Sequence, residues 1–270
     1  MIKIKIHQNF DSDEVIYSKA ISMTPNLDGV WKNLQIVNDN TYDLLVIFNM
    51  PSFNDYVPEK TLVFESETRE TRKNFKSFYI DRKQDFYYIH DTENHFNLDL
   101  WYHGLDFKEL LNKDLFVKDK EFSVINSGLS SLPGHILRNN FITDISSDFI
   151  FDLFGRSRRY LSKKADGLMN YKYTFNCEND FEPNYFTEKI LDGILCECLT
   201  FYDGCPNIKD FIDERSFIKI DLHDFEYSKK EIKKVFESDF YKVLKPFIKK
   251  EKKRLMNDFN PLNIIWEHIK

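Results

Sequence analysis

The sequence predicts an α/β fold made of two domains, and three observations favour it. Strand-like and helical segments alternate along residues 122–220, which is typical of a parallel sheet covered by helices. A length of 270 residues with 42% hydrophobic content is enough for one large or two modest cores. A charged stretch at residues 112–121 separates this regular half from the first half. We therefore expect two α/β halves with a cleft between them.

The first half is predicted to form mainly strands. The opening residues Met1-Ile-Lys-Ile-Lys-Ile-His alternate between apolar and polar side chains, as a half-buried strand does. Apolar and aromatic runs predict further strands, and weaker helical patterning predicts two helices. The strands fall at residues 3–7, 34–37, 42–48, 61–65, 86–90 and 98–101, and the helices at residues 68–75 and 106–111.

The second half alternates between strand and helix more regularly. Strands are predicted at residues 122–126, 149–153, 173–177, 199–202 and 217–220, and helices at residues 134–146, 163–169 and 206–212. Thr187 can cap a further helix, whose apolar residues recur at helical spacing. Lys-rich stretches near the end of the chain predict long helices with solvated faces.

Composition and charge argue against several classes of protein. A net charge of −6 and a pI near 5.7 disfavour a general nucleic-acid binder, which needs clustered cations. No apolar run resembles a signal peptide or a transmembrane anchor, so we expect a soluble, cytoplasmic protein. The four cysteines have neither paired C-x-x-C spacing nor nearby histidines, which favours buried free thiols over a zinc site or a disulfide.

Polar residues gather between the third predicted strand of the second half and the helix that follows it. Glu178 and Asn179 begin the turn after the strand, and Glu188 and Lys189 lie in the first turn of the helix. A crevice at the end of a parallel strand, the unpaired amides of a helix start and a lysine all favour a phosphate group. The sequence therefore predicts a nucleotide-type site with a diphosphate as its natural ligand.

Four blocks of the sequence carry a resemblance to a known family. They are Leu-Val-Phe-Glu-Ser-Glu at residues 62–67, residues 122–127 followed by Pro133-Gly-His-Ile-Leu-Arg138, Asp-Leu-Phe-Gly-Arg at residues 152–156, and residues 171–208. The last block holds Glu-Asn, then Tyr-x-Thr-Glu-Lys, then a Gly turn beyond the next strand. With these blocks the chain resembles the glycosyltransferase family 10 fucosyltransferases, especially the short soluble bacterial and viral type.

The resemblance implies a GT-B-like architecture, in which two Rossmann-like α/β domains face each other across a cleft. It implies an N-terminal acceptor-binding domain at residues 1–116 and a C-terminal nucleotide-sugar donor-binding domain at residues 117–270, and the last helix could pack back on the N-terminal domain. The implied reaction is inverting transfer of fucose, or a related sugar, from a GDP-sugar such as GDP-fucose to a glycan hydroxyl. The family's phosphate contacts match Arg138 and Lys189, and its other donor contacts match Asn179, Tyr185 and Glu188.

The family's general base is a carboxylate just after a strand of the N-terminal domain. Glu65 and Glu67 both match that position, and we favour Glu67 because it lies further out on the loop after the buried strand. No metal or other cofactor is required, since Arg and Lys side chains can neutralise the diphosphate. The string Asp11-Ser12-Asp13 has the D-x-D pattern of metal-binding glycosyltransferases, but we interpret it as an ordinary loop or helix start.

Two alternative functions stay open. The chain could be a transferase that uses a different nucleotide sugar, because these motifs do not resolve the base or the sugar. It could also be a catalytically inactive nucleotide- or glycan-binding protein. A lipid-linked glycan acceptor on the cytosolic side could bring the protein into peripheral contact with a membrane.

Overall fold

The computed structural model describes residues 1–68, 78–93, 95–156 and 158–270, which form two compact units. Unit 1 comprises Met1–Trp101, Asp106–Glu109 and Met256–Lys270, and unit 2 comprises Tyr102–Leu105 and Leu110–Leu255. The expected boundary at residues 116 and 117 thus falls inside unit 2. The C-terminal residues after Leu255 belong to unit 1.

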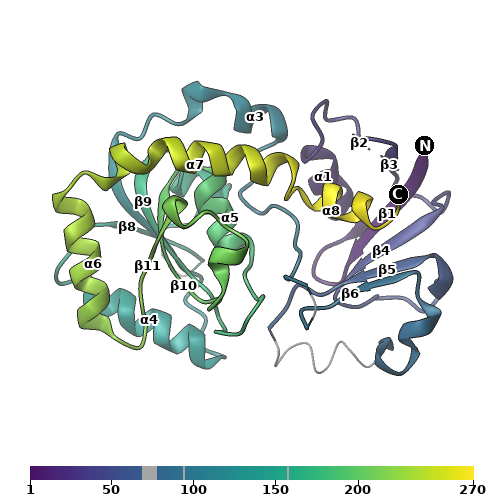
Figure 1. The fold of residues 1–270 in the computed structure, drawn as a ribbon, viewed down its shortest axis with the longest axis horizontal. Coiled ribbons are helices and arrows are strands. Elements are labelled where there is room, and N and C mark those ends of the chain that lie inside the picture. Colours follow the sequence, from purple (N-terminus) through teal and green to yellow (C-terminus); the bar gives the residue numbers. More distant parts are fainter. Residues whose placement is uncertain (69–77, 94, 157) are drawn as a thin grey trace. The chain divides into compact units, whose positions relative to one another are not determined.

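Unit 1 contains a six-stranded sheet in the order β2-β3-β1-β4-β5-β6 (Figure 1). All neighbouring strands are parallel except β2 and β3. The strands are β1 (Ile2–Gln8), β2 (Val30–Trp31), β3 (Leu34–Ile36), β4 (Leu44–Phe48), β5 (Thr61–Phe64) and β6 (Tyr88–His90). Among the residues that the structure describes in unit 1, the helices are α1 (Asp13–Ser22) and α8 (Pro261–Glu267), and α3 (Phe107–Leu111) spans the boundary between the units.

Local chemistry explains the central strands and the first helix of unit 1. Every residue of β4 and β5 is buried, as expected for parallel strands covered on both faces. Helix α1 begins at Asp13 because the Ser12 hydroxyl accepts a hydrogen bond from the Val15 amide and caps the helix. Asp11-Ser12-Asp13 therefore lies at a helix start, which is one of the two interpretations that the sequence left open.

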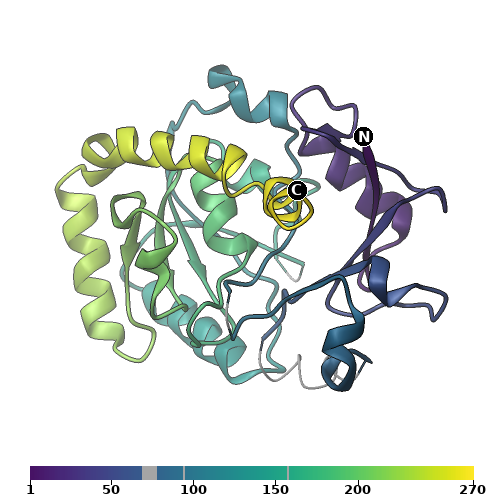
Figure 2. The ribbon, with the colours of Figure 1, turned by 45° about the vertical axis from the view of Figure 1, so that its right-hand side comes forward.

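Unit 2 contains a five-stranded, fully parallel sheet in the order β11-β10-β9-β7-β8. The strands are β7 (Lys120–Ile125), β8 (Asp152–Phe154), β9 (Tyr171–Cys177), β10 (Leu199–Asp203) and β11 (Phe217–Lys219). The helices are α4 (Pro133–Ile145), α5 (Glu188–Leu195), α6 (Phe225–Glu237) and α7 (Phe240–Asn257), and α7 continues into unit 1. Figure 2 gives a second view of α6 and α7 along the outside of this sheet.

The strand order of unit 2 creates a place where a ligand can bind. From β7 the chain passes first to β8 on one side and then to β9 on the other, so the winding direction reverses between β7 and β9. In open α/β sheets the loops at such a topological switch point separate and leave a crevice at the carboxyl ends of the strands. The loops after β7 and β9 are therefore where a site is expected.

Most predicted strands are present, but several predictions were wrong. Residues 98–101 form no strand, although Leu98, Leu100 and Trp101 are buried. Apolar side chains can be buried in the core without their backbone forming hydrogen bonds to a neighbouring strand. The helices predicted at residues 163–169 and 206–212 are short 3₁₀ turns at Lys164–Gly167 and Ile208–Asp210. The sequence predicted a loop or helix start at Asp11-Ser12-Asp13 but not the extent of α1. Most of the helix predicted at residues 68–75 lies outside the described residues.

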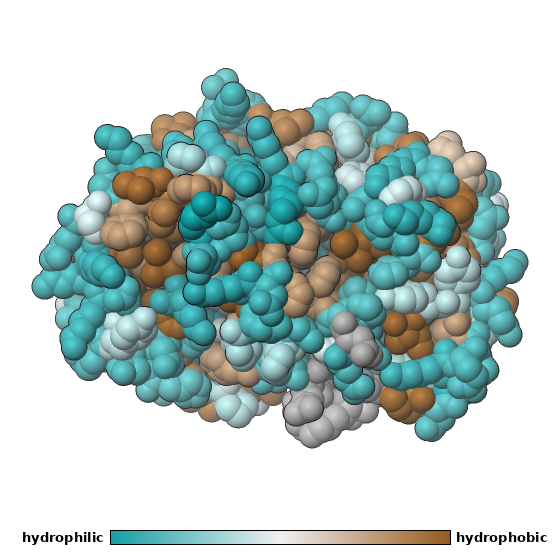
Figure 3. All heavy atoms as spheres, in the orientation of Figure 1, coloured by the Kyte–Doolittle hydropathy of each residue, from teal (hydrophilic) through white to brown (hydrophobic). Residues whose placement is uncertain are grey.

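The surface and the cysteines agree with the composition. Hydrophilic side chains cover most of the face drawn in Figure 3. All four cysteines are buried free thiols, as predicted. Among the helices in the described ranges, none combines the length and apolar character that crossing a membrane requires.

Candidate functional site

A pocket of about 530 Å³ lies at the switch point of unit 2. Its walls come from the ends of β7 and β9, the loop after β8, and the starts of α4 and α5. The volume is in the range of sites that hold small molecules and cofactors. Its charged lining residues are Arg138, Arg156, Lys164, Glu188 and Lys189.

Arg138 is a buried cation on the wall formed by α4. The residue is 6% exposed, and Nη1 donates to the Cys177 carbonyl oxygen at 2.9 Å and to Asn179 Oδ1 at 2.8 Å. Its Nε has no hydrogen-bond partner, and no carboxylate in the described part of the chain forms an ion pair with it. Burial lowers the pKa of Arg138. A buried charge of this kind is costly unless an anion compensates it.

The start of α4 is held tightly against the turn after β9. A side chain at Gly134 would place its Cβ only 2.1 Å from the carbonyl oxygen of Asn179. Only glycine therefore allows this close approach, which brings Arg138, one turn further along the helix, to the end of β9. Proline at the first position of α4 supplies a preset φ for the helix start.

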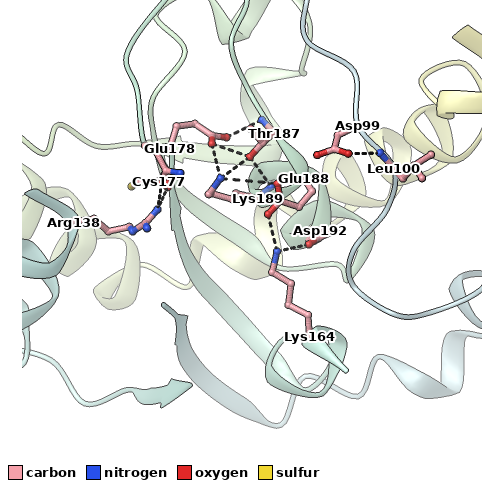
Figure 4. Close-up of polar contacts among 11 residues, drawn as sticks. Asp99, Leu100, Arg138, Lys164, Cys177, Glu178, Thr187, Glu188, Lys189 and Asp192 are labelled. Atoms are coloured by element: carbon pink, nitrogen blue, oxygen red, sulfur yellow. Dashed lines mark hydrogen bonds and ion pairs between the residues drawn. The ribbon is translucent and has the colours of Figure 1, made fainter. Parts of the chain in front are cut away.

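Glu178, just after β9, organises the start of α5 (Figure 4). Its carboxylate is fully buried and accepts from the Thr187 amide at 2.9 Å, the Thr187 hydroxyl at 2.8 Å and Lys189 Nζ at 3.1 Å. Gly204 packs directly against this side chain, since a Cβ there would lie 2.4 Å from Glu178 Cγ. Thr187 caps α5, as predicted.

This arrangement corrects one expectation about the helix start. The Thr187 amide and the Lys189 ammonium do not face an open loop, because Glu178 already binds both. Burial alone lowers the pKa of Lys189, but Glu178 and Glu188 raise it by more, so the ammonium stays charged. Lys189 still lines the pocket. It is therefore a fixed positive charge rather than a mobile one.

A second ion-pair group lies beside the first (Figure 4). Lys164 Nζ lies 3.2 Å from Glu188 Oε1 and 2.7 Å from Asp192 Oδ2. Burial opposes ionisation of Glu188, but Lys189 and Lys164 outweigh it and lower the pKa to about 2. Burial raises the pKa of Asp192 to about 6, against the opposing effect of Lys164. At neutral pH Glu188 is thus an ionised acceptor on the pocket wall.

The structure brings most of the predicted donor residues together. Arg138, Asn179, Glu188 and Lys189 all line the pocket, whereas the Tyr185 side chain is 2% exposed and is not part of that lining. Lys164 was missed because it reaches its partners in α5 across 24 and 28 residues of sequence. No local pattern marks such a contact.

The two candidate bases belong to unit 1, at the end of β5. Glu65 is 2% exposed and accepts from the Tyr79 hydroxyl, from the Thr92 amide at 3.0 Å and from the Thr92 hydroxyl at 3.1 Å. Glu67 is partly exposed. The structure therefore gives these two residues different surroundings, one buried and one partly exposed.

No protein-family model and no curated protein matches this sequence. Solved structures do match. The crystal structure of an α1,3-fucosyltransferase has a TM-score of 0.54 at 17% identity, over 90% of this chain and 80% of that chain. A glycosyltransferase from Rickettsia africae ESF-5 has a TM-score of 0.52 at 11% identity, over 100% and 98% of the two chains. T4 phage BGT, solved with its UDP-glucose substrate, has a TM-score of 0.50 at 12% identity, over 98% and 97%.

These likenesses define the class of fold. Two units, each built on a mainly parallel sheet, and a match along nearly the whole chain to three glycosyltransferase structures identify a GT-B-like α/β fold, as predicted. At these identities the likeness is one of fold.

Proposed function

We propose that this protein is a glycosyltransferase whose unit 2 pocket binds the diphosphate of a nucleotide-sugar donor. One observation carries the proposal. Arg138 is a buried cation with an unpaired Nε and no carboxylate partner in the described residues, and it lines a pocket at a topological switch point. A diphosphate supplies the missing negative charge and acceptors that suit a guanidinium fork.

The neighbouring residues fit the remaining parts of such a donor. Lys189 adds a fixed positive charge on the same pocket, and charge builds on the diphosphate as the sugar–phosphate bond breaks. Glu188 is ionised and can only accept hydrogen bonds, so hydroxyls of the ribose or of the sugar are its natural partners. Asn179 is already oriented by its bond to Arg138. We therefore propose that these cations, rather than a metal, balance the charge of the diphosphate.

Glu67 is the proposed general base. Inversion needs a carboxylate that takes the proton of the acceptor hydroxyl while its oxygen attacks the anomeric carbon and the nucleoside diphosphate leaves from the opposite face. Glu65 is enclosed and already accepts three hydrogen bonds, whereas Glu67 is partly exposed. The contrast favours Glu67 over Glu65.

GDP-fucose is the proposed donor and a glycan hydroxyl the proposed acceptor. The motif blocks at residues 152–156 and 171–208 and the likeness in fold to an α1,3-fucosyltransferase support this choice. The similar likeness to T4 phage BGT, a protein that takes UDP-glucose, makes UDP-glucose the alternative donor. A third alternative is a binding protein without turnover.

The test is a transfer assay with radiolabelled GDP-fucose and UDP-glucose, run in EDTA with free and lipid-linked glycan acceptors. We expect transfer from GDP-fucose, a loss of roughly 100-fold or more in Glu67→Gln, and retained donor binding in that variant. Loss in Glu65→Gln but not in Glu67→Gln would reassign the base. Transfer only from UDP-glucose would reassign the donor, and donor binding without any transfer would favour the inactive protein.

A further inference from the structure

A Ser–His–Asp arrangement lies at the switch point of the other sheet, in unit 1. From β1 the chain passes to β3 on one side and then to β4 on the other, so the winding reverses between β1 and β4. His7 lies near the carboxyl end of β1, Ser52 follows β4, and Asp13 is the first residue of α1. The three side chains thus meet at the kind of sheet edge where α/β proteins bind ligands.

The hydrogen bonds run in the order that activates a serine. His7 Nδ1 lies 2.8 Å from Asp13 Oδ1, and His7 Nε2 lies 3.1 Å from Ser52 Oγ. The Ser52 amide also donates to Nε2, at 3.1 Å. An amide nitrogen can only donate, so Nε2 is the acceptor in this contact, and the ring N–H is on Nδ1, facing Asp13. This is the tautomer in which histidine can accept a proton from a hydroxyl.

The surroundings of the trio differ from one residue to the next. His7 is 3% exposed, and the Phe53 ring packs edge-on against it with centroids 4.7 Å apart. Lys5 Nζ lies 3.0 Å from Asp13 Oδ2. Burial opposes ionisation of Asp13, but His7 and Lys5 outweigh it and lower the pKa of that carboxyl. Ser52 is exposed. The ionised Asp13 carboxylate therefore orients the buried imidazole of His7, and this imidazole contacts the exposed hydroxyl of Ser52.

We propose that Ser52 is an activated nucleophile that accepts acyl groups from esters, with His7 as its general base and Asp13 as the residue that positions the imidazole. Ser52 Oγ attacks the ester carbonyl carbon while its proton passes to His7 Nε2. The alcohol then leaves with that proton, and water, deprotonated by His7, releases the acid from the acyl-serine.

This activity is independent of the donor pocket in unit 2. The competing view is that His7 only joins β1, α1 and the loop after β4 through its hydrogen bonds. The two views differ in reactivity, because a merely structural serine reacts no faster than any other exposed serine.

The test is reaction of the full-length protein with a fluorophosphonate probe, followed by peptide mass spectrometry, and hydrolysis of p-nitrophenyl acetate. We expect a single phosphonylated serine at Ser52, no labelling of that peptide in Ser52→Ala, and labelling roughly 100-fold slower in His7→Gln. Asp13→Asn should slow the labelling, and the labelled residue should still be Ser52. Circular dichroism confirms that each variant is folded.

The chain provides a matched control serine. Ser131 is exposed and lies 3.3 Å from His135 Nδ1, but the charged groups that act most strongly on that imidazole are the cations Arg138 and Lys189 rather than a carboxylate. Ser131→Ala should leave the labelling unchanged. No adduct on Ser52, labelling equal to that of Ser131, or an unchanged rate in His7→Gln would each overturn the proposal.

Discussion

Asp192 illustrates at a single residue how burial and ion pairing compete. It is 1% exposed and bound to Lys164, yet its pKa is raised from 3.8 to about 6 because burial outweighs the ion pair. The native protein therefore holds this proton more tightly than the unfolded chain does. Protonated Asp192 therefore adds to the free energy of unfolding below about pH 4, and this contribution is lost as the pH rises to about 6.

We predict that Asp192→Asn reduces the loss of stability between pH 4 and pH 6, since an amide does not titrate. The measurement is urea unfolding of the wild type and the variant at several pH values between 4 and 6. The unfolding free energy of the variant should depend less on pH across this window. Parallel pH profiles for the two proteins would contradict the assigned direction of the pKa shift.

At the scale of the element, the start of α5 depends on one hydroxyl. Thr187 caps the helix and donates to the buried carboxylate of Glu178. Thr187→Ala removes both interactions and should cost roughly 1–2 kcal/mol of unfolding free energy. Thr187→Ser keeps the hydroxyl and is the matched control. Equal destabilisation of the two variants in urea titrations would show that the methyl group, and not the cap, stabilises this helix.

The start of α4 depends on the absence of a side chain. In Gly134→Ala the new Cβ meets the backbone carbonyl of Asn179 at 2.1 Å, so the helix must move and carry Arg138 with it. We predict a loss of roughly 1–3 kcal/mol in stability and weaker nucleotide binding. Asn140→Ala, at an exposed position of α4, should change neither. An unchanged nucleotide affinity of Gly134→Ala in calorimetry would show that nucleotide binding does not depend on the position of α4.

The elements also show how far the sequence alone can lead. Alternation of strand and helix predicted the unit 2 sheet, and short-range chemistry predicted the Thr187 cap, because both depend on neighbours in sequence. Arg138 and Lys189 were predicted from the family resemblance together with phosphate chemistry. The partnership of Glu178 with Thr187 and Lys189 was not predicted, because it depends on how the loop of 9 to 11 residues between them folds back. The contacts of Lys164 with α5 were not predicted because they span 24 and 28 residues of sequence.

At the scale of the whole molecule, each unit buries a neutral histidine. Burial lowers the pKa of His90 in unit 1 and of His103 in unit 2 to about 3. As the pH falls, these two histidines are protonated in the unfolded chain before they are protonated in the folded protein. The free energy of unfolding therefore decreases as the pH falls from about 6.5 towards 3.

We predict that the thermal midpoint falls between pH 7 and pH 5, and that it falls less in His103→Gln, whose amide does not titrate. His223→Gln, at an exposed position, is the control and should follow the wild type. Differential scanning calorimetry at several pH values measures these midpoints. A midpoint that is independent of pH in the wild type would rule out buried neutral histidines.

The most direct test of the proposed diphosphate site is calorimetric titration of the purified protein with GDP, UDP and CMP, with EDTA or Mn²⁺. We predict metal-independent binding of a nucleoside diphosphate, stronger than that of CMP. Binding should weaken roughly 10- to 100-fold in Arg138→Gln, which loses charge-assisted hydrogen bonds, and stay unchanged in Arg159→Gln, whose side chain is 66% exposed. Absence of diphosphate binding, or equal affinity in Arg138→Gln, would contradict the claim that this pocket holds a nucleotide diphosphate.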